Sequence, residues 1–372
     1  MREAGGGRLG ELEVLRAVAI LYVLVEHIST LLPGHVDTIE PFFYGGVDLF
    51  FCISGFVITS GFAASITAAR ATNRFGRAVG AFYIRRAFRI LPLAGAAFVF
   101  TLAVSVAIFG AGPDLLAQSR ADALAILFNV QNLHYGLCVQ SGAAYCGQFG
   151  VYWSLSLEEQ FYLVFPFLFL LRRRYLVVLL LAVAALFAWL PRTTMVWMVR
   201  LDAISLGVLL GLARGSLGAI EPTWLGAALP RRVCTPLLLI AMVAVPYLNV
   251  PSFPIVVSAI CLALVFVASF GKGYLVGESP LRALLIWIGQ RSFAIYLLHQ
   301  AVFWMVSHTG AVLMPPSWQL SLVSIAAAAV LLAVIADISF RLLETPLRLV
   351  GKGIADAFAM GEKSQPAAVA PT

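Results

Sequence analysis

Two ionisable side chains in the first long apolar segment could take part in chemistry. Arg16 and His27 both lie in the stretch from Leu12 to Leu32. At about 100° per residue, a helix brings His27 back to within roughly 20° of the face of Arg16, about 16 Å further along. Ionisable groups inside a membrane are costly and usually functional, and a histidine can act as a general base near neutral pH. The pair therefore indicates an enzyme.

The elements that must position this pair are membrane-length helices. The chain has 372 residues and is 61% hydrophobic but only 12% charged, whereas about 25% of a soluble domain is charged. Apolar stretches of about 20 residues, each long enough to cross a bilayer, recur along the chain. We predict an all-α, polytopic membrane helix bundle of about ten transmembrane helices, at 12–32, 41–63, 88–110, 152–171, 174–190, 194–213, 234–248, 253–270, 283–307 and 319–343.

The distribution of positive charge sets the predicted orientation. With the N-terminus in the cytoplasm, nearly all lysines and arginines fall on the cytoplasmic side of these spans, as positive-inside topology requires. Both termini are then cytoplasmic. The net charge of +7 reflects topology and contact with membrane lipid, and we expect no nucleic-acid partner. The arginines predicted to lie outside are Arg120, Arg192 and Arg200.

Domain organisation is simple in this interpretation. Residues 1–352 form one membrane domain, and residues 353–372 form a disordered cytoplasmic tail rich in alanine and proline. The first helix lacks a cleavage pattern, so we expect it to stay in the protein. In the largest outer loop, 111–151, Cys138 and Cys146 could form a disulfide or remain free thiols. No spacing of cysteines and histidines resembles a zinc site, so we expect no metal.

Depth in the membrane separates the ionisable residues into two groups. The outer half contains histidines and carboxylates, and the inner half is mostly cationic. This layering suits a polyanionic ligand that enters from the cytoplasm and a hydroxyl-rich ligand that enters from outside. The outer group is His27, Asp48, Glu158, Glu159, Arg200, Asp202 and His299, and the inner group is Arg16, Arg85, Arg86, Arg89, Arg291, Asp337, Arg341 and Glu344.

Several motifs make the chain similar to a known family over roughly residues 9–350. It resembles the acyltransferase family 3 membrane proteins, which O-acylate cell-surface glycans and some small molecules. Phe293 departs from the family, where a tyrosine is expected, and no soluble esterase-like domain follows the last span. The motifs are Leu15-Arg16 with His27, Gly46 to Ile58, Arg85 to Pro92, Trp153 to Tyr162, Ser292 to His299, and Glu344-Thr345-Pro346.

The resemblance and the chemistry together suggest roles for the outer residues. Acyl transfer to an alcohol needs a base, and we predict His27 as that catalytic base rather than as a histidine that only joins two helices. His299 could orient His27, bind the acceptor, or be a packed, satisfied histidine. Glu158 could pair with His27 and fix its tautomer, bind sugar hydroxyls, or simply favour the first turn of a helix capped by Ser154.

Three further residues complete the outer site. Asp48 follows Gly45-Gly46 and could pair with an arginine or line the acceptor pocket, and we predict it as catalytic with His27 and Glu158. Ser54 and Tyr162 are predicted to bind substrate together with His299. Ser54-Gly55 also favours tight contact between helices, and Ser54 has no dedicated base that would make it a nucleophile.

The inner arginines suit phosphate, because arginine forks match phosphate oxygens. We predict that Arg16, Arg86 and Arg89 bind acetyl-CoA (acyl-CoA), the donor substrate that the resemblance implies. Ordinary contact with lipid headgroups is the alternative for such arginines, and Arg85 could face lipid.

The function predicted is an O-acetyltransferase of the bacterial inner (plasma) membrane. It moves an acyl group, expected to be acetyl, from cytoplasmic acyl-CoA to a hydroxyl of an envelope or exported polysaccharide, with a glycan or lipid-linked saccharide as acceptor. Acylation of a small molecule by the same residues and a proton-coupled transporter are the alternatives, since buried histidines and carboxylates also form proton relays. Direct transfer and a covalent intermediate both remain open.

Overall fold

The computed structural model describes residues 3–32, 43–142, 146, 148–248, 253–313 and 318–361. Every regular element in these ranges is a helix, which confirms the all-α class. The α-helices are α1 (Glu3–Glu26), α2 (Gly45–Ala71), α3 (Phe75–Phe109), α4 (Pro113–Leu127), α5 (Gln131–Ser141), α6 (Tyr152–Leu168), α7 (Arg173–Trp189), α8 (Thr194–Val199), α9 (Asp202–Ala213), α10 (Ala228–Tyr247), α11 (Phe253–Ala268), α12 (Pro280–Leu313), α13 (Trp318–Ser339) and α14 (Thr345–Met360). Short 3-10 helices are η1 (Ile28–Leu31), η3 (Arg214–Ile220) and η4 (Thr223–Gly226), and η5 (Phe340–Glu344) is a π-helical turn.

The length and apolarity of the helices support an integral membrane protein. Six helical segments in the described ranges are long and apolar enough to cross a membrane. α11 is apolar but shorter. The membrane helix bundle is thus supported, while the number of ten spans and the orientation stay predictions. The six segments are Gly45–Ala71, Phe75–Phe109, Thr194–Ile220, Ala228–Tyr247, Pro280–Val312 and Gln319–Met360.

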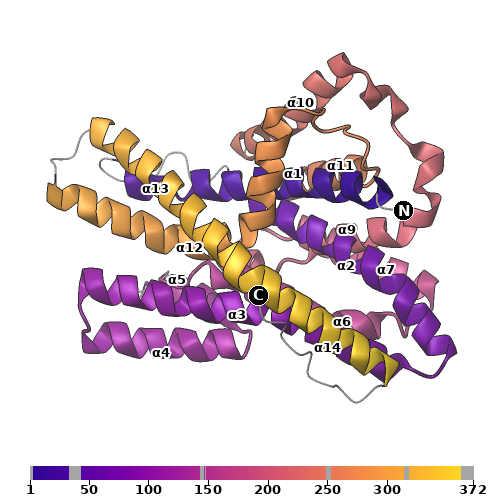
Figure 1. Ribbon diagram of the computed structural model, residues 1–372, viewed down its shortest axis with the longest axis horizontal. Coiled ribbons are helices and arrows are strands. Elements are labelled where there is room, and N and C mark those ends of the chain that lie inside the picture. The colour runs from indigo at the N-terminus through magenta and orange to yellow at the C-terminus, as the bar shows by residue number, and fades with distance from the viewer. Residues whose placement is uncertain are drawn as a thin grey trace, which may run out of the picture.

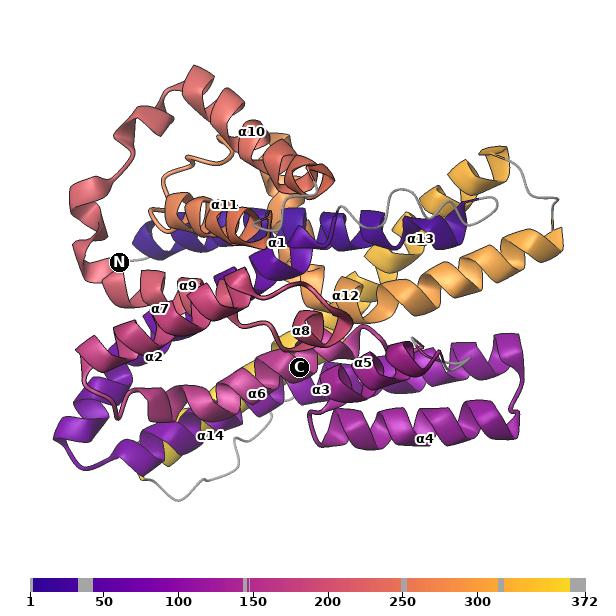
Figure 2. The ribbon, with the colours of Figure 1, turned by 180° about the vertical axis from the view of Figure 1, so that it is seen from behind.

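The helices are arranged so that both ends of the described chain lie at one end of the bundle. In Figure 1, α1 begins and α14 ends at the right-hand end of the molecule, where α2 also leads into α3. α1 packs on α12, and α2 packs on α9. The reverse view in Figure 2 shows α6, α7 and α9 near α2, and α5 near α4.

Two predicted spans are interrupted at ionisable residues. The span 12–32 is α-helical only to Glu26, and His27 forms the junction to the 3-10 helix η1. The span 194–213 breaks at Arg200 and Leu201, between α8 and α9. The division of 152–190 into two helices is confirmed by α6 and α7. The breaks were not predicted, because apolar composition continues through both.

Two segments expected to lack regular structure contain helices. The outer loop 111–151 contains α4 and α5. The disordered tail was predicted from residue 353, but α14 continues to Met360, because Gly351 and Ala355 are buried on its packed face. For residues 353–360 the prediction is wrong, and residues 362–372 lie outside the described part.

Glycines allow α2 and α9 to approach closely. A side-chain carbon added at Gly55 would collide with the backbone of Ile204 and Val208, and one added at Gly207 would collide with the backbone of Cys52. This is the small-residue packing common between membrane helices. The tight helix contact predicted from Ser54-Gly55 is therefore confirmed.

The contact predicts a specific loss of stability. Gly55→Leu should destabilise the protein by about 3 kcal/mol, the upper part of the usual overpacking range, because the obstructing atoms are backbone. Thermal unfolding of the detergent-purified protein measures this. Gly61→Leu on the same helix is the control, since a side-chain carbon there meets nothing within 4 Å. Equal melting temperatures for the two variants would refute the packing argument.

Candidate active site

A cavity of about 770 Å³ lies between α1, α2, α3, α6 and α12. Most of its charged side chains are arginines, so we call it the arginine cavity. It gathers residues from five helices that are far apart in sequence. Its charged and hydroxyl-bearing side chains are Arg16, Ser54, Arg86, Arg89, Ser154, Glu158, Tyr162, Ser292 and Tyr296.

Glu158 is the centre of a hydrogen-bond cluster in this cavity. Its Oε1 accepts hydrogen bonds from the hydroxyls of Ser54 and Tyr162, which are themselves 2.5 Å apart. Glu158 and Tyr162 are four residues apart on α6 and so share one helix face. The Arg86 guanidinium carbon lies 4.6 Å from the centre of the Tyr162 ring. A carboxylate, two hydroxyls and a cation thus meet at one wall.

The three predicted arginines line this cavity together. Arg16 pairs with Glu13 at 2.6 Å. In the described part of the chain, Arg86 and Arg89 form no ion pair with a carboxylate. Their guanidinium groups are therefore available to an anionic ligand. Glu159, the neighbour of Glu158, does not line the arginine cavity, which supports the choice of Glu158 as the site residue.

A second cavity, of about 710 Å³, adjoins the first and contains His27. We call it the histidine cavity. Its wall combines aromatic rings with hydrogen-bonding groups, and the buried Tyr44 hydroxyl and Gln300 Oε1 have no hydrogen-bond partner in the described chain. Aromatic ring faces and polar atoms that lack a hydrogen-bond partner suit a ligand with many hydroxyl groups. The polar and aromatic lining consists of Glu26, His27, Phe43, Tyr44, Tyr135, Trp153, Trp197, Tyr296 and Gln300.

The hydrogen bonds of His27 define its tautomer. Its Nδ1 lies 2.8 Å from the carbonyl oxygen of Val23, and because a carbonyl can only accept, Nδ1 must carry the hydrogen. Nε2 of the neutral ring then holds the free lone pair that a base needs. Of the alternatives considered for Glu158, a pairing that fixes the His27 tautomer is not the one found: Glu158 bonds to Ser54 and Tyr162, and the backbone of α1 fixes the His27 ring.

His299 of α12 is the immediate neighbour of His27, as one of the predicted alternatives required. The two rings are 5.0 Å apart in an edge-on arrangement. His299 is fully buried, its Nδ1 donates to the carbonyl of Tyr296 at 2.7 Å, and its Nε2 has no partner in the described residues. His27 lines the histidine cavity, whereas His299 contacts the His27 ring without lining the cavity itself.

Tyr296 and Val47 line both cavities. The Tyr296 hydroxyl bonds to Ser154 Oγ at 2.6 Å and to the carbonyl of Val151 at 3.1 Å. These two side chains therefore form a thin wall between the arginines and the histidines. Sequence analysis missed Tyr296 as a site residue, since only the fold brings it to Ser154; its position three residues before His299 was the one available signal.

Asp48 lies outside both cavities and forms a buried ion pair. Its Oδ1 is 2.7 Å from Nε of Arg200, and both side chains are buried. The Arg200 guanidinium carbon lies 3.8 Å from the centre of the Trp197 ring, which lines the histidine cavity. Of the two predicted alternatives, the arginine partner is correct, and the catalytic role for Asp48 is not supported. Asp48 instead positions the wall of the cavity.

A second ion pair lies beside the first. Asp202 binds Arg192 at 2.6 Å and accepts a hydrogen bond from Ser258 at 2.9 Å. Asp202 is thus paired with Arg192, while Arg200 is paired with Asp48. The break between α8 and α9 follows from this, because Arg200 leaves the helix to reach α2.

A disulfide closes the segment that borders the histidine cavity. Cys138 at the end of α5 is bonded to Cys146, with the two Cα atoms 5.8 Å apart. The disulfide alternative is thus confirmed in the structure.

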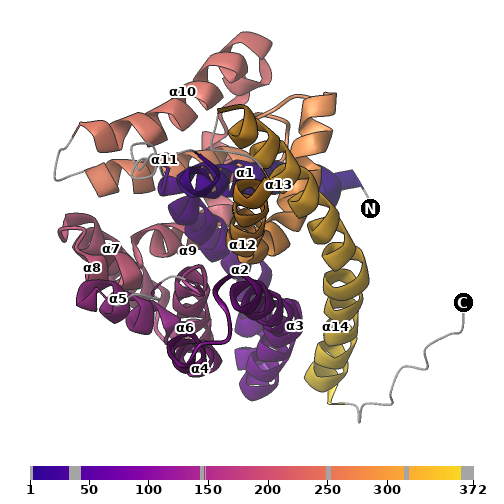
Figure 3. The same ribbon diagram turned by 90° about the vertical axis from the view of Figure 1, so that its left-hand side faces the viewer.

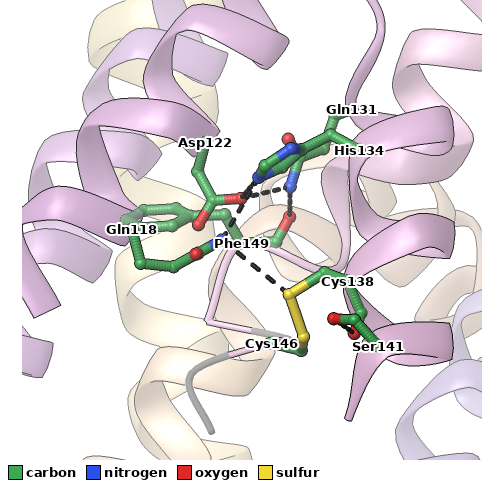
Figure 4. The surroundings of a disulfide bond; sticks show 8 residues. All are labelled: Gln118, Asp122, Gln131, His134, Cys138, Ser141, Cys146 and Phe149. Carbon is green, nitrogen blue, oxygen red and sulfur yellow. Dashed lines mark hydrogen bonds and ion pairs between the residues drawn. A yellow bond between two sulfur atoms is a disulfide. The ribbon is translucent and has the colours of Figure 1, made fainter. Parts of the chain in front are cut away.

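A small polar cluster lies beside the disulfide. Figure 4 shows Gln118, Asp122 and His134 there. Burial raises the pKa of Asp122, although the hydrogen bond from Gln131 and the nearby His134 act in the opposite direction.

The disulfide should contribute to stability and to the cavity wall. It restrains the chain between Tyr135 and Gly150, which both line the histidine cavity. Closing a loop of 8 residues is worth about 2.5 kcal/mol by loop entropy. We expect the Cys138→Ala/Cys146→Ala protein to melt at lower temperature and to lose sensitivity to reductant. Cys234→Ala, at a half-buried free cysteine, should change neither property. A wild-type melting temperature for the double variant would contradict the role.

The fold and the two cavities define a class: a polytopic membrane protein with a cationic cavity and a histidine cavity on either side of one tyrosine. The chain belongs to the acyltransferase domain family, acyltransferase family 3, whose model matches residues 9–338. The resemblance inferred from the motifs is confirmed. No solved structure matches this protein.

Three relatives are similar along nearly the whole chain. They are the peptidoglycan O-acetyltransferase OatA of Listeria monocytogenes, 26% identical over 91% of this chain, the putative peptidoglycan O-acetyltransferase YrhL of Bacillus subtilis, 27% identical over 91%, and the O-acetyltransferase OatA of Staphylococcus aureus, 26% identical over 95%. The chain spans 55%, 55% and 59% of these relatives, which therefore contain a substantial part without a counterpart here.

Proposed function

We propose that this protein is a membrane O-acyltransferase that moves an acetyl group from cytoplasmic acetyl-CoA to a hydroxyl of an envelope or exported polysaccharide. The observation that supports this function best is the pair of cavities that share Tyr296 and Val47. A cationic cavity suits a phosphate-bearing donor, and an aromatic, histidine-containing cavity suits a hydroxyl-bearing acceptor. The two ligands could meet at the shared wall.

The proposed topology gives each ligand its own side of the membrane. We place about ten spans across the bacterial inner (plasma) membrane, with both termini in the cytoplasm and residues 1–352 as the membrane domain. The common position of the start of α1 and the end of α14 is consistent with this arrangement. The acyl donor then enters from the side of Arg86 and Arg89, and the acceptor enters from the side of the disulfide.

The relatives narrow the proposed acceptor. Three of them are named as acetyltransferases, two with peptidoglycan in the name. We infer a saccharide acceptor of the same general chemistry, either a glycan or a lipid-linked saccharide. The aromatic rings of Tyr44, Trp153 and Trp197 could stack against sugar faces, while Glu26 and Gln300 could accept hydrogen bonds from sugar hydroxyls.

The proposed mechanism uses His27 as general base. Nε2 of His27 takes the proton from the acceptor hydroxyl as its oxygen attacks the acetyl carbonyl carbon. The new C–O bond forms, the C–S bond of the thioester breaks, and the CoA thiolate receives the proton from His27. His299 holds the His27 ring, and Glu158 with Ser54 and Tyr162 orients the acyl group. Arg16, Arg86 and Arg89 bind the donor.

Inverted membrane vesicles with labelled acetyl-CoA test the proposal. Because the donor site faces the cytoplasm, we expect CoA release and labelled glycan in inverted vesicles and much less of both in right-side-out vesicles. Mass spectrometry of glycans from a deletion strain should show an acetyl-sized mass loss that the wild-type gene restores. Solute accumulation driven by a proton gradient without thioester turnover would instead identify a transporter.

A further inference from the structure

A groove of about 930 Å³ runs between α2, α3 and α14 and is lined by five cationic side chains. The rest of its lining is apolar, with Val57, Ile58, Phe62, Phe82 and Leu349, and no carboxylate of the described chain lines it. We call it the basic groove. Its cations are Arg85, Arg86, Arg89, Arg348 and Lys352.

The basic groove is continuous with the arginine cavity. Arg86 and Arg89 line both, so a ligand in the groove can extend between these two side chains toward Glu158 and Tyr162. The remaining cations lie further along, on α14. The groove and the cavity together form a path that is cationic where it begins beside α14 and is lined by hydroxyls and a carboxylate where it ends at Glu158 and Tyr162.

Most of the cations in the groove form no direct ion pair in the described chain. Arg348 and Lys352, like Arg86 and Arg89, take part in no ion pair within the described ranges. Arg85 contacts Asp356 of α14 at 3.3 Å, and both side chains are partly exposed. Glu344 is the nearby carboxylate that attracts Arg89 and Arg348. Like charges that line one groove repel one another, and a bound anion would offset that repulsion.

The position of Arg348 and Lys352 follows from how α14 packs. They are four residues apart and therefore share a helix face. Gly351, between them, lies directly against Phe88 of α3, where a side-chain carbon would collide with the ring. Gly80 of α3 makes the corresponding contact with Phe358. Figure 3 shows α14 running beside α3 at the edge of the bundle. The two cations are thus held in place by a close helix contact.

We propose that the basic groove binds the phosphate groups of the acyl donor and that Arg348 and Lys352 of α14 are part of that site. The inference rests on the proposed function and deepens it. Acetyl-coenzyme A carries several phosphates at one end and a thioester at the other. This fits a path that is cationic beside α14 and leads to Glu158. The apolar lining contacts the uncharged part of the ligand. Both cations lie beyond the residues that match the family, 9–338.

The same phosphate chemistry occurs in anionic lipid headgroups, so the test must separate the two sources. The full chain is purified into nanodiscs, and initial rates of CoA release are measured for wild type and for Arg348→Ala/Lys352→Ala. Two donors are compared: acetyl-CoA, and S-acetyl-pantetheine, which has the thioester but no nucleotide phosphates. The control is Arg214→Ala/Arg232→Ala, since both arginines are exposed and line neither cavity nor groove.

We expect the Arg348→Ala/Lys352→Ala variant to raise the KM for acetyl-CoA at least tenfold with little change in kcat, because two charge-assisted contacts to phosphate, which are stronger than neutral hydrogen bonds, are lost. The KM for S-acetyl-pantetheine should not change, and the control should behave as wild type. A wild-type KM for acetyl-CoA in the groove variant would overturn the assignment. If wild-type protein turns over neither thioester, the proposed function itself fails.

Nanodiscs with and without phosphatidylglycerol test the lipid source. A donor site predicts the same rise in KM in both lipid compositions. If the groove binds lipid headgroups, the variant loses a stabilisation by phosphatidylglycerol that wild type shows, while its KM for acetyl-CoA stays unchanged. That result would overturn the donor assignment.

Discussion

Replacing His27 by alanine should lower acetyl transfer by about 10²- to 10⁴-fold, the usual contribution of a positioned general base. The reason is the fixed tautomer: Val23 accepts the Nδ1 hydrogen, and Nε2 is left to take the proton of the acceptor. The KM for acetyl-CoA should change little, because the arginines lie in the other cavity. CoA release and labelled glycan, measured at saturating donor, test this.

His27→Gln separates a base from a structural group. Its amide can donate to the Val23 carbonyl and keep the end of α1 in place, but it cannot accept a proton near neutral pH. We expect the variant to melt near the wild-type temperature and to be as inactive as His27→Ala. His308→Ala is the control, since His308 is exposed on α12 and lines neither cavity. Activity within a few-fold of wild type for His27→Gln would exclude the base mechanism.

Breaking the Asp48–Arg200 pair should have the largest effect on stability. Arg200 is fully buried, with 0% of its surface exposed to solvent. Asp48→Ala therefore leaves an uncompensated buried charge, which typically costs about 3–5 kcal/mol. Asp202 and Arg192 lie close by but are bound to each other. We expect a large fall in melting temperature, together with weaker acceptor binding, because Arg200 stacks on Trp197.

The double variant Asp48→Leu/Arg200→Met distinguishes pairing from mere burial. Apolar side chains of similar volume often replace a buried ion pair without loss of stability. We therefore expect the double variant to recover most of the melting temperature lost in Asp48→Ala. A double variant less stable than either single variant would mean that each residue stabilises the fold through other contacts.

The sequence predicted the helices better than their interruptions. Apolar length alone located the segments that became α2, α3, α10 and α12, although α3 begins at Phe75, well before the predicted start at residue 88. It could not locate the breaks at His27 and Arg200, since these depend on tertiary partners. Arg200 leaves its helix to reach Asp48, and that contact joins residues 152 positions apart. The helical character of α14 was also missed, because its packing on Phe88 is a long-range contact.

The structure groups the predicted site residues differently from the predicted layers. Glu158, which was assigned to the outer group, lies with the arginines of the inner group in one cavity, whereas His27 lines the other cavity and its ring contacts that of His299. The sequence left the partner of Glu158 open between His27 and other groups, because helix register alone cannot show that Ser54 and Tyr162 both point at Glu158. Tyr296, which borders both cavities, had one sequence signal, its position three residues before His299, and that signal alone does not show that the fold brings it to Ser154.

The π-helical turn η5 sets the rotational phase between two helices that otherwise form one continuous rod. A π turn holds one more residue than an α turn, and η5 lies between α13 and α14. Removing one residue there would rotate α14 by roughly 100° relative to α13, carrying Arg348 and Lys352 away from Arg89. The cationic face of α14 is thus aligned with the basic groove by a single-residue irregularity between α13 and α14.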